Sequence, residues 1–238
     1  MDDFEPQMTL FSPTAKRPLL GLTVLVVEDS RFASEAVRLL CLRSGARIRR
    51  ADCLRSARRH LRVYRPSAVI VDLGLPDGSG EELIAELASA APRVGVILGC
   101  SGDTGAEMLA MTAGADGFLA KPIDSLAAFQ AAVLSHLPRD AQPIGPRAVT
   151  TARVEPDKIA FRDDLAHIAS VMTNASDVKT VDYVAQFVGG VARSARDSTL
   201  EAAADALVRD RAEGLPTRSH LARLAGIVQD RLSTASVI

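Results

Sequence analysis

Three short aliphatic runs of this chain are each followed by charged residues. The first run ends before Glu28 and Asp29, the second leads into Asp72, and the third precedes Lys121. Such runs, alternating with helical patterns, are typical of buried strands in a parallel sheet. Because the carboxyl ends of parallel strands share one crevice, we expect these side chains to meet at one point.

The chemistry of this predicted site follows from its charges. Three clustered carboxylates repel one another unless a cation lies among them. Oxygen ligands without Cys or His favour Mg²⁺, which proteins commonly pair with phosphate. The Lys121 ammonium can neutralise the oxygens of a phosphoryl group, so the pattern predicts phosphate chemistry with a magnesium cofactor.

The order of these motifs resembles the receiver domain of bacterial two-component response regulators. An acidic pair comes first, then Asp72-Leu-Gly-Leu-Pro-Asp-Gly, then Ala120-Lys121-Pro122, and the resemblance covers about residues 20–138. It implies an α/β, flavodoxin-like fold: a doubly wound, five-stranded parallel sheet. It also implies a signalling protein rather than an enzyme.

The resemblance assigns roles to individual residues. Asp72 would accept the phosphoryl group and Lys121 would neutralise it. Phe118, three residues before Lys121, matches the aromatic switch position of the family. The magnesium ligands it implies are Glu28, Asp29, Asp72 and the backbone carbonyl of Gly74.

The family's Thr or Ser hydroxyl, which binds the phosphoryl group, is not found at its usual position in this sequence. The family carries Thr or Ser at the end of the fourth strand, and counting back from Lys121 without a gap puts Gly99 there. Ser101 takes that position only if the loop is two residues out of register. Both alignments stay open, and Gly99 would weaken the coupling between phosphorylation and Phe118.

Composition excludes several classes of protein. The net charge of −1 gives no global electrostatic case for binding DNA, and the absence of Trp argues against stacking on single-stranded nucleic acid. No apolar run is long enough to span a membrane. The three cysteines show no metal or redox spacing and are expected to be reduced thiols. We therefore expect a cytoplasmic protein.

The chain divides into four parts by composition and periodicity. We expect a flexible leader over residues 1–20, the receiver domain over 21–138, a proline-rich linker over 139–156 and an all-α four-helix bundle over 157–238. Ser30 and Gly45 should begin and end the first helix. The Ser198-x-x-Glu201 pattern predicts a capping box at the start of the third bundle helix. The other receiver helices are expected near residues 54–64, 81–88, 104–113 and 125–136.

The second predicted helix of the bundle carries an unusual pair of glycines. Gly189 and Gly190 follow Gln186 by three and four residues, on the face away from the valine seam. Two glycines inside a helix cost about 2 kcal/mol, so close approach of a partner would explain them. The arrangement resembles a histidine-phosphotransfer (HPt) domain over about residues 157–233, with Gln186 at the histidine position. Glutamine cannot relay phosphate, so the resemblance implies a non-catalytic docking surface at Gln186, Gly189 and Gly190.

These features together predict a response regulator phosphorylated on Asp72. Its partners would be a histidine kinase or phosphotransfer protein and, through the bundle, another receiver domain or a second copy. An unrelated helical bundle remains an alternative for the C-terminal half. Two other functions also stay open: a phosphorelay protein with His167, which has acidic neighbours, as a second phosphoacceptor, and a DNA-binding regulator. We expect the bundle to lie near the face formed by the fourth and fifth strand–helix units.

Overall fold

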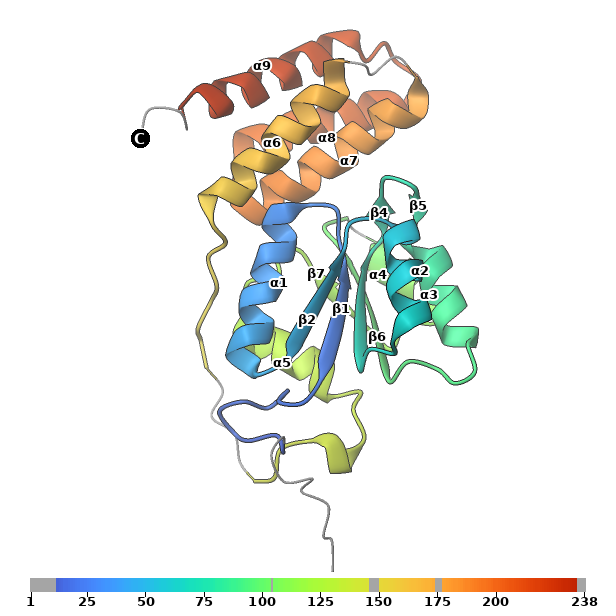
Figure 1. Ribbon diagram of the computed structural model, residues 1–238. Helices are drawn as coiled ribbons and strands as arrows, with labels where there is room; N and C mark the ends of the chain where they lie inside the picture. The colour runs from blue at the N-terminus through green and yellow to red at the C-terminus, as the bar shows by residue number, and fades with distance from the viewer. Residues whose placement is uncertain (1–11, 104, 146–149, 174–176, 235–238) are drawn as a thin grey trace, which may run out of the picture.

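The structure is a computed structural model of the 238-residue chain, and it describes residues 12–103, 105–145, 150–173 and 177–234. It contains two parts. An α/β domain holds the strands and the helices α1 to α5, and a helical domain holds α6 to α9 (Figure 1). None of the described helices is long and apolar enough to cross a membrane.

The α/β domain is built on a five-stranded sheet in the order β2-β1-β3-β6-β7, with every neighbouring pair parallel. This strand order is that of doubly wound flavodoxin-like folds, as the sequence predicts. The aliphatic residues of the central strands are fully buried because helices cover both faces. The strands are β1 (Thr23–Val27), β2 (Arg47–Ala51), β3 (Ala68–Asp72), β6 (Val96–Ser101) and β7 (Gly117–Ala120).

Two hydrophobic layers cover the sheet. Helices α1 and α5 pack on one face, and α2, α3 and α4 pack on the other. Their bounds lie close to the predicted ranges: α1 (Arg31–Ser44), α2 (Leu54–Val63), α3 (Gly80–Ser89), α4 (Ala106–Ala113) and α5 (Leu126–Leu134). A two-stranded hairpin, β4 (Gly74–Leu75) with β5 (Gly78–Ser79), follows Asp72 and was not predicted.

The first helix begins and ends where the sequence predicts. The Ser30 hydroxyl accepts a hydrogen bond from the Ala33 N–H, which satisfies one of the unpaired donors of the first turn. Gly45 ends the helix in the left-handed region, at φ 87°, where a side chain would be strained. The start of α1 is therefore fixed directly beside Glu28 and Asp29.

The predicted leader and linker are partly ordered against the α/β domain. Leu19 is fully buried in the layer beneath α1, so this end of the predicted leader packs against the domain; residues 1–11 lie outside the described part. Val154 is buried in the same layer, and its N–H donates to the Asp124 carbonyl. Residues 150–157 thus run along the domain beside α1 up to α6 (Figure 1). At the start of the predicted linker, Arg139–Ala141 forms a short 3₁₀ turn.

The C-terminal half is helical, with α6 (Lys158–Thr173), α7 (Val178–Ala195), α8 (Ser198–Ala212) and α9 (Arg218–Thr234). Each of these helices packs against two of the others around one hydrophobic core. The predicted capping box is wrong by one residue. Asp197, not Ser198, accepts the Leu200 N–H as the N-cap of α8, and its carboxylate also binds Arg231 of α9.

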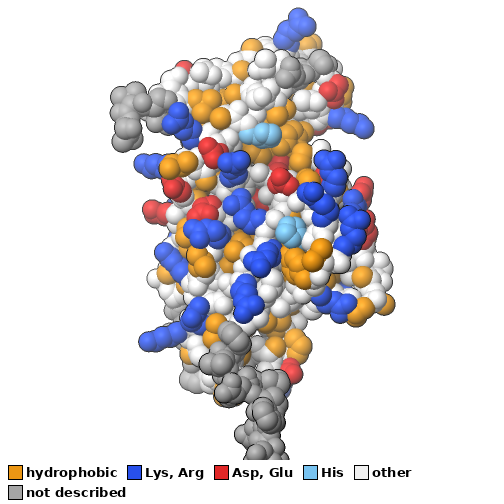
Figure 2. All heavy atoms as spheres, in the orientation of Figure 1, with side chains coloured by type: hydrophobic (Ala, Val, Ile, Leu, Met, Phe, Trp, Pro, Cys, Tyr) orange, Lys and Arg blue, Asp and Glu red, His pale blue; other side chains and the backbone are white. Residues whose placement is uncertain are grey.

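The helical domain lies over the carboxyl edge of the sheet, above the β4–β5 hairpin (Figure 1). Helices α6 and α7 contact α1, and α7 contacts β4. The expectation that it packs near the fourth and fifth units is therefore wrong for most of the interface, because α6 and α7 pack on the start of α1. Figure 2 shows Lys and Arg side chains spread over the face of the α/β domain that includes β2. Exposed arginines on this edge strand, at Arg49 and Arg50, protect it from pairing with another strand.

Candidate functional site: a buried acidic cluster beneath the helical domain

The acidic site lies at the carboxyl edge of the sheet, where three strands end. Glu28 and Asp29 follow β1, Asp72 is the last residue of β3, and Lys121 follows β7. Lys121 Nζ lies 2.7 Å from Glu28 Oε2 and 3.1 Å from Asp72 Oδ1, and all three side chains are nearly buried. The structure therefore brings together groups separated by more than forty residues along the chain, at the place that the strand pattern predicts.

The carboxylates of this cluster are destabilised in their charged form by burial and by mutual repulsion. Burial, together with the charge of Asp72, raises the pKa of Glu28 to about 8, although Lys121 opposes the shift. Burial and Asp72 likewise raise the pKa of Asp29 to about 7. Burial alone would lower the pKa of Lys121, but Asp72 and Glu28 raise it well above its ordinary value. One ammonium thus faces three carboxylates, and a further cation would relieve their repulsion.

The donor atoms present fit a magnesium ion. Carboxylate oxygens of Glu28 and Asp72 lie within 4.8 Å of each other and of Cys100 Sγ, and Asp29 adjoins them. Burial holds the pKa of the Cys100 thiol well above its ordinary value, so it stays protonated and is a poor ligand. The remaining ligands are hard oxygens, the type that Mg²⁺ prefers. Cys100 was missed from the sequence because nothing in its spacing marks it; its register opposite Asp72 places it there.

The structure places both candidates for the switch hydroxyl. Gly99 pairs with Phe118 across β6 and β7, and a β-carbon at Gly99 would lie 2.5 Å from Ala110 Cβ and 3.3 Å from Phe118 Cδ2. Ser101 is buried, lines the same cavity as Asp72, and accepts the Asp103 N–H. Gly99 therefore faces α4 and Phe118, whereas Ser101 is the hydroxyl at the acidic site.

Comparison with known proteins agrees with this geometry. The response regulator receiver domain family model matches residues 24–133. Residues 24–133 form a response regulator receiver domain. The match ends before the linker, so the helical domain lies outside it.

Curated relatives match the same part of the chain. The KDP operon transcriptional regulatory protein KdpE of Escherichia coli is 32% identical over 99 residues, covering 42% of this chain and 44% of KdpE. The probable transcriptional regulatory protein TcrX of Mycobacterium tuberculosis is 35% identical over 102 residues, with the same two coverages. The chain thus spans less than half the length of these relatives.

Solved structures are similar to the receiver domain as well. A putative response regulator from Chloroflexus aurantiacus is 28% identical, with a TM-score of 0.45, covering 48% of this chain and 98% of that one. The receiver domain of a sensor histidine kinase from Pseudomonas aeruginosa is 23% identical, with a TM-score of 0.44, covering 49% and 97%. The latter is described with a magnesium ion coordinated in its active site cleft.

Helix α7 lies directly over the receiver domain's acidic site. Gln186 points to Gly74 so closely that a β-carbon on Gly74 would overlap the Gln186 side-chain amide. The Tyr183 hydroxyl, three residues earlier on the same helix, donates a 2.8 Å hydrogen bond to Asp29 Oδ2. Tyr183 was missed because its role depends on a contact between domains, although its (i, i+3) spacing from Gln186 puts both on one face.

The three residues of the predicted docking surface differ in exposure. Gln186 is exposed on α7, as predicted, and Gly190 is half-buried. Gly189 is buried, so its assignment to an open surface is wrong. The Arg193 guanidinium, one turn later, folds back over Gly189, with Nη2 3.4 Å from the position of a β-carbon there.

Further contacts hold the two domains together. Asp164 of α6 accepts hydrogen bonds from the Ser30 hydroxyl at 2.7 Å and from the N–H groups of Arg31 and Phe32 at 2.8 and 3.0 Å. A carboxylate at a helix N-terminus is stabilised by these donors and by the helix dipole. Asp164 was also missed, because the sequence gives no sign that a residue of the helical domain caps α1.

Two arginines of the helical domain bind acidic residues in receiver-domain loops. Arg193 Nη2 lies 2.8 Å from Asp103 Oδ1, and Arg196 forms an ion pair with Asp124. His167 is exposed on α6, and its ring lies beside Phe187 with Nε2 3.5 Å from the Tyr183 hydroxyl. It does not line the cavity that contains Asp72.

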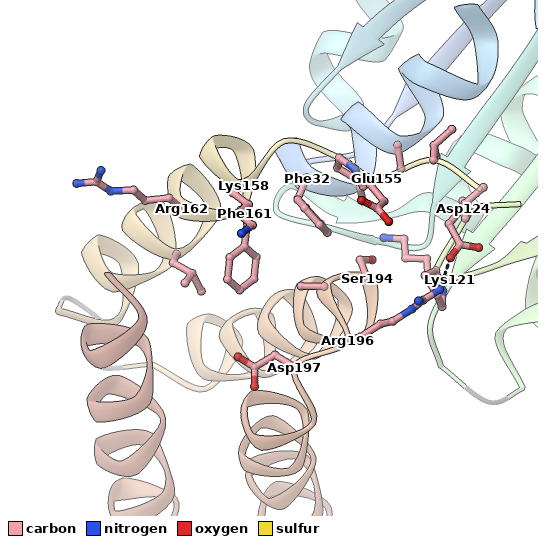
Figure 3. A pocket seen from close by; sticks show the side chains of 18 of the residues that line it. Phe32, Lys121, Asp124, Glu155, Lys158, Phe161, Arg162, Ser194, Arg196 and Asp197 are labelled. Atoms are coloured by element: carbon pink, nitrogen blue, oxygen red, sulfur yellow. Dashed lines mark hydrogen bonds and ion pairs between the residues drawn. The ribbon is translucent and has the colours of Figure 1, made fainter. Parts of the chain in front are cut away.

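The interface contains two spaces of very different size. The cavity between Asp72 and Gln186 has a volume of about 20 Å³, which is room for about one water molecule. Beside it, a cleft of about 1110 Å³ opens between α1, the linker and the helical domain (Figure 3). Phe32 and Phe161 meet edge to face in this cleft, with ring centroids 5.6 Å apart, and Lys121 reaches its inner end.

Proposed function

We propose that this protein is a two-component response regulator that forms an acyl phosphate on Asp72. The observation that carries the proposal is the buried contact of Lys121 Nζ with both Glu28 and Asp72 at the carboxyl edge of the sheet. The family of the receiver domain supports the same chemistry. The donor would be a phosphohistidine of a histidine kinase or phosphotransfer protein.

The reaction requires little covalent chemistry from the protein. A carboxylate oxygen of Asp72 attacks the phosphorus, the P–N bond of the donor breaks, and the imidazole leaves with that electron pair. Charge spreads over the equatorial phosphoryl oxygens as the bonds exchange. Lys121, already held 3.1 Å from Asp72 Oδ1, is positioned to neutralise this charge.

A magnesium ion would be held by the carboxylates of Glu28, Asp29 and Asp72 and by the Gly74 carbonyl. It supplies positive charge to the same phosphoryl oxygens when bound. Asp29 Oδ2 already accepts the Tyr183 hydroxyl, so a metal would share this carboxylate with α7, and the Gly74 carbonyl lies in the strand that α7 covers.

The helical domain is proposed to be an HPt-like four-helix bundle without phosphotransfer activity. Gln186 lies on the exposed face of α7 and faces a receiver domain, the position that an HPt histidine takes in the resemblance. A carboxamide has no nucleophilic imidazole, so the domain would act through protein contacts, either with a receiver domain or by self-association. We propose a cytoplasmic signalling protein without enzymatic output.

Intact-mass measurement tests the assignment. Incubation with acetyl phosphate and Mg²⁺ should add one phosphoryl group that hydroxide removes and acid does not. Asp72→Asn should abolish the addition, while Asp77→Asn, on the neighbouring turn, should retain it. Equal labelling of the wild type and Asp72→Asn would overturn the proposal.

His167 gives a separate outcome in the same experiment. A label on the Asp72→Asn variant that is stable in base and lost in acid would indicate phosphohistidine. His167→Gln would then remove it, and the protein would be a phosphorelay intermediate rather than a terminal receiver.

A further inference from the structure

The approach to Asp72 is filled by the chain's own helical domain. The cavity between them is lined on one side by the acidic cluster and on the other by Gln186, Phe187 and Gly190 of α7. Its 20 Å³ admits about one water molecule. A phosphoryl group attached to an imidazole needs space for several heavy atoms in line with the Asp72 carboxylate. The arrangement seen here therefore excludes a phosphohistidine donor.

We infer that the α7 face carrying Tyr183, Gln186 and Arg193 is a receiver-binding surface that competes, within the same chain, with the phosphodonor domain for the Asp72 edge. This inference rests on the proposed phosphorylation of Asp72. The donor class it implies is a helical phosphohistidine domain, because a helix already occupies the edge where the donor must bind. Phosphorylation then requires the two domains to separate.

The contacts of this surface match the receiver edge in charge and polarity. Arg193 binds Asp103 in the loop after β6, and the Tyr183 hydroxyl donates to Asp29 after β1. The uncharged Gln186 amide lies between them at Gly74. The Arg193 guanidinium and the neutral Tyr183 and Gln186 side chains thus cover an edge of the sheet that carries excess negative charge. Among the residues that line the cavity, none from α7 is a carboxylate.

The same contacts couple docking to the metal ligands. Asp29 Oδ2 accepts the Tyr183 hydroxyl in the docked arrangement, and a cation in the site would compete with that hydrogen bond for the negative charge of the same carboxylate. A phosphoryl mimic on Asp72 would also need more space than the 20 Å³ beneath α7. Two ligands that compete in this way lower each other's affinity by the same factor. Mg²⁺ together with a phosphoryl mimic should therefore favour separation of the domains, and loosening the domains should favour the metal.

Two backbone amides give a direct measure of separation. The N–H groups of Arg31 and Phe32 are in the first turn of α1, where no intrahelical acceptor exists, and both donate to Asp164 of the helical domain. The N–H of Ala33 donates instead to Ser30 within the receiver domain. Separation exposes the first two amides and leaves the third bonded, so Ala33 is an internal control.

The test combines amide exchange by NMR with the rate of phosphorylation in the full chain. Arg193→Glu reverses the charge opposite Asp103 and is the opening variant. Arg211→Glu is the matched control, because Arg211 pairs with Asp182 inside the helical domain. We expect Arg193→Glu to raise exchange at Arg31 and Phe32, and labelling of Asp72 by a phosphorylated HPt protein, by at least about fivefold. Arg211→Glu should change neither.

Beryllofluoride with Mg²⁺ should raise exchange at the same two amides of the wild type while leaving Ala33 unchanged. Equal rates of labelling in wild type and Arg193→Glu, with faster exchange in the variant, would overturn the competition and leave the proposed function intact. Unchanged exchange in Arg193→Glu would overturn the docking role of this surface. Faster exchange without any labelling of Asp72 in either protein would instead overturn the proposed function.

Discussion

The Tyr183 hydroxyl of α7 donates a 2.8 Å hydrogen bond to Asp29 Oδ2 at the end of β1. This single bond joins two parts of the chain that are 154 residues apart and connects the interface of the domains to the acidic site. Burial and the neighbouring Asp29 charge raise the pKa of Tyr183, so the phenol stays protonated and remains a donor. Asp29 thus belongs both to the domain interface and to the proposed metal site.

Removing this hydroxyl should increase the affinity for magnesium. Tyr183→Phe keeps the ring, which packs on Phe187, but frees Asp29 from its donor. The loss of one hydrogen bond to a carboxylate, about 1 kcal/mol, predicts a dissociation constant for Mg²⁺ lower by about fivefold in calorimetric titration. Tyr64→Phe, at the other tyrosine of the chain, is the control and should bind like wild type. Unchanged affinity in Tyr183→Phe would contradict the coupling.

Replacing Asp164 should loosen the interface far more than replacing its neighbour. Asp164→Ala leaves the Ser30 hydroxyl and two N–H groups of α1 without their acceptor. We expect a loss of about 2 kcal/mol in the free energy of unfolding, measured by urea titration with circular dichroism. Asp163→Ala removes only an exposed ion pair with Arg31 and should cost less than about 1 kcal/mol. Equal costs would show that the cap contributes nothing.

A side chain at Gly99 should destabilise the fold, because the Ala110 side chain already occupies the space that it would need. A β-carbon there would lie 2.5 Å from Ala110 Cβ. Gly99→Ala should therefore lower the free energy of unfolding by about 1–3 kcal/mol. Ala110→Gly should cost about 1 kcal/mol alone, as glycine in a helix, and should remove most of the Gly99→Ala penalty in the double variant. Additive costs in this double-mutant cycle would contradict the overlap.

The ion pair between Asp197 and Arg231 should make the free energy of unfolding of the helical domain decrease at acidic pH. Its hydrogen bonds with Arg231 hold the pKa of Asp197 below its ordinary value. A lowered folded-state pKa stabilises the protein above the unfolded value of about 4, and this stability is lost as the pH falls through the folded value. Asp197→Asn keeps a good N-cap but loses the charge. We expect it to cost about 1 kcal/mol at pH 7, with the difference from wild type shrinking as the pH falls below about 4 and disappearing only below the lowered folded-state pKa. A difference that persists at low pH would show that the charge is not responsible.

The receiver half was predictable because its signals are local and repeated. Each aliphatic run is a strand of the parallel sheet, and the rule that parallel strands end at one edge is sufficient to bring Asp72 and Lys121 together. The cap at Ser30 and the left-handed glycine at Gly45 depend only on adjacent residues. The strand β6 continues past Gly99 to Ser101, because its pairing with β7 extends to Ala120.

The interface was not predictable, because each of its contacts joins residues far apart in the chain. In the sequence, Asp164 looks like any surface carboxylate. The helical periodicity that identifies α6 does not indicate that Asp164 caps a helix of the other domain. The same periodicity predicted that Gln186 lies outside the core, which is confirmed. It could not show that the exposed face would be covered by the receiver domain of the same chain.

The docked linker sets how the two halves can move. Val154 is buried against the receiver domain, and α6 begins at Lys158, so a tether of about 15 Å joins them. A tether this short keeps the helical domain at a local concentration of the order of millimolar. The interface can therefore be weak in its own right and still remain closed, and a separation that leaves Val154 docked would have to pivot at residues 155–157. A donor present at micromolar concentration would have to bind about a thousandfold more tightly than α7 does to hold the edge for half of the time.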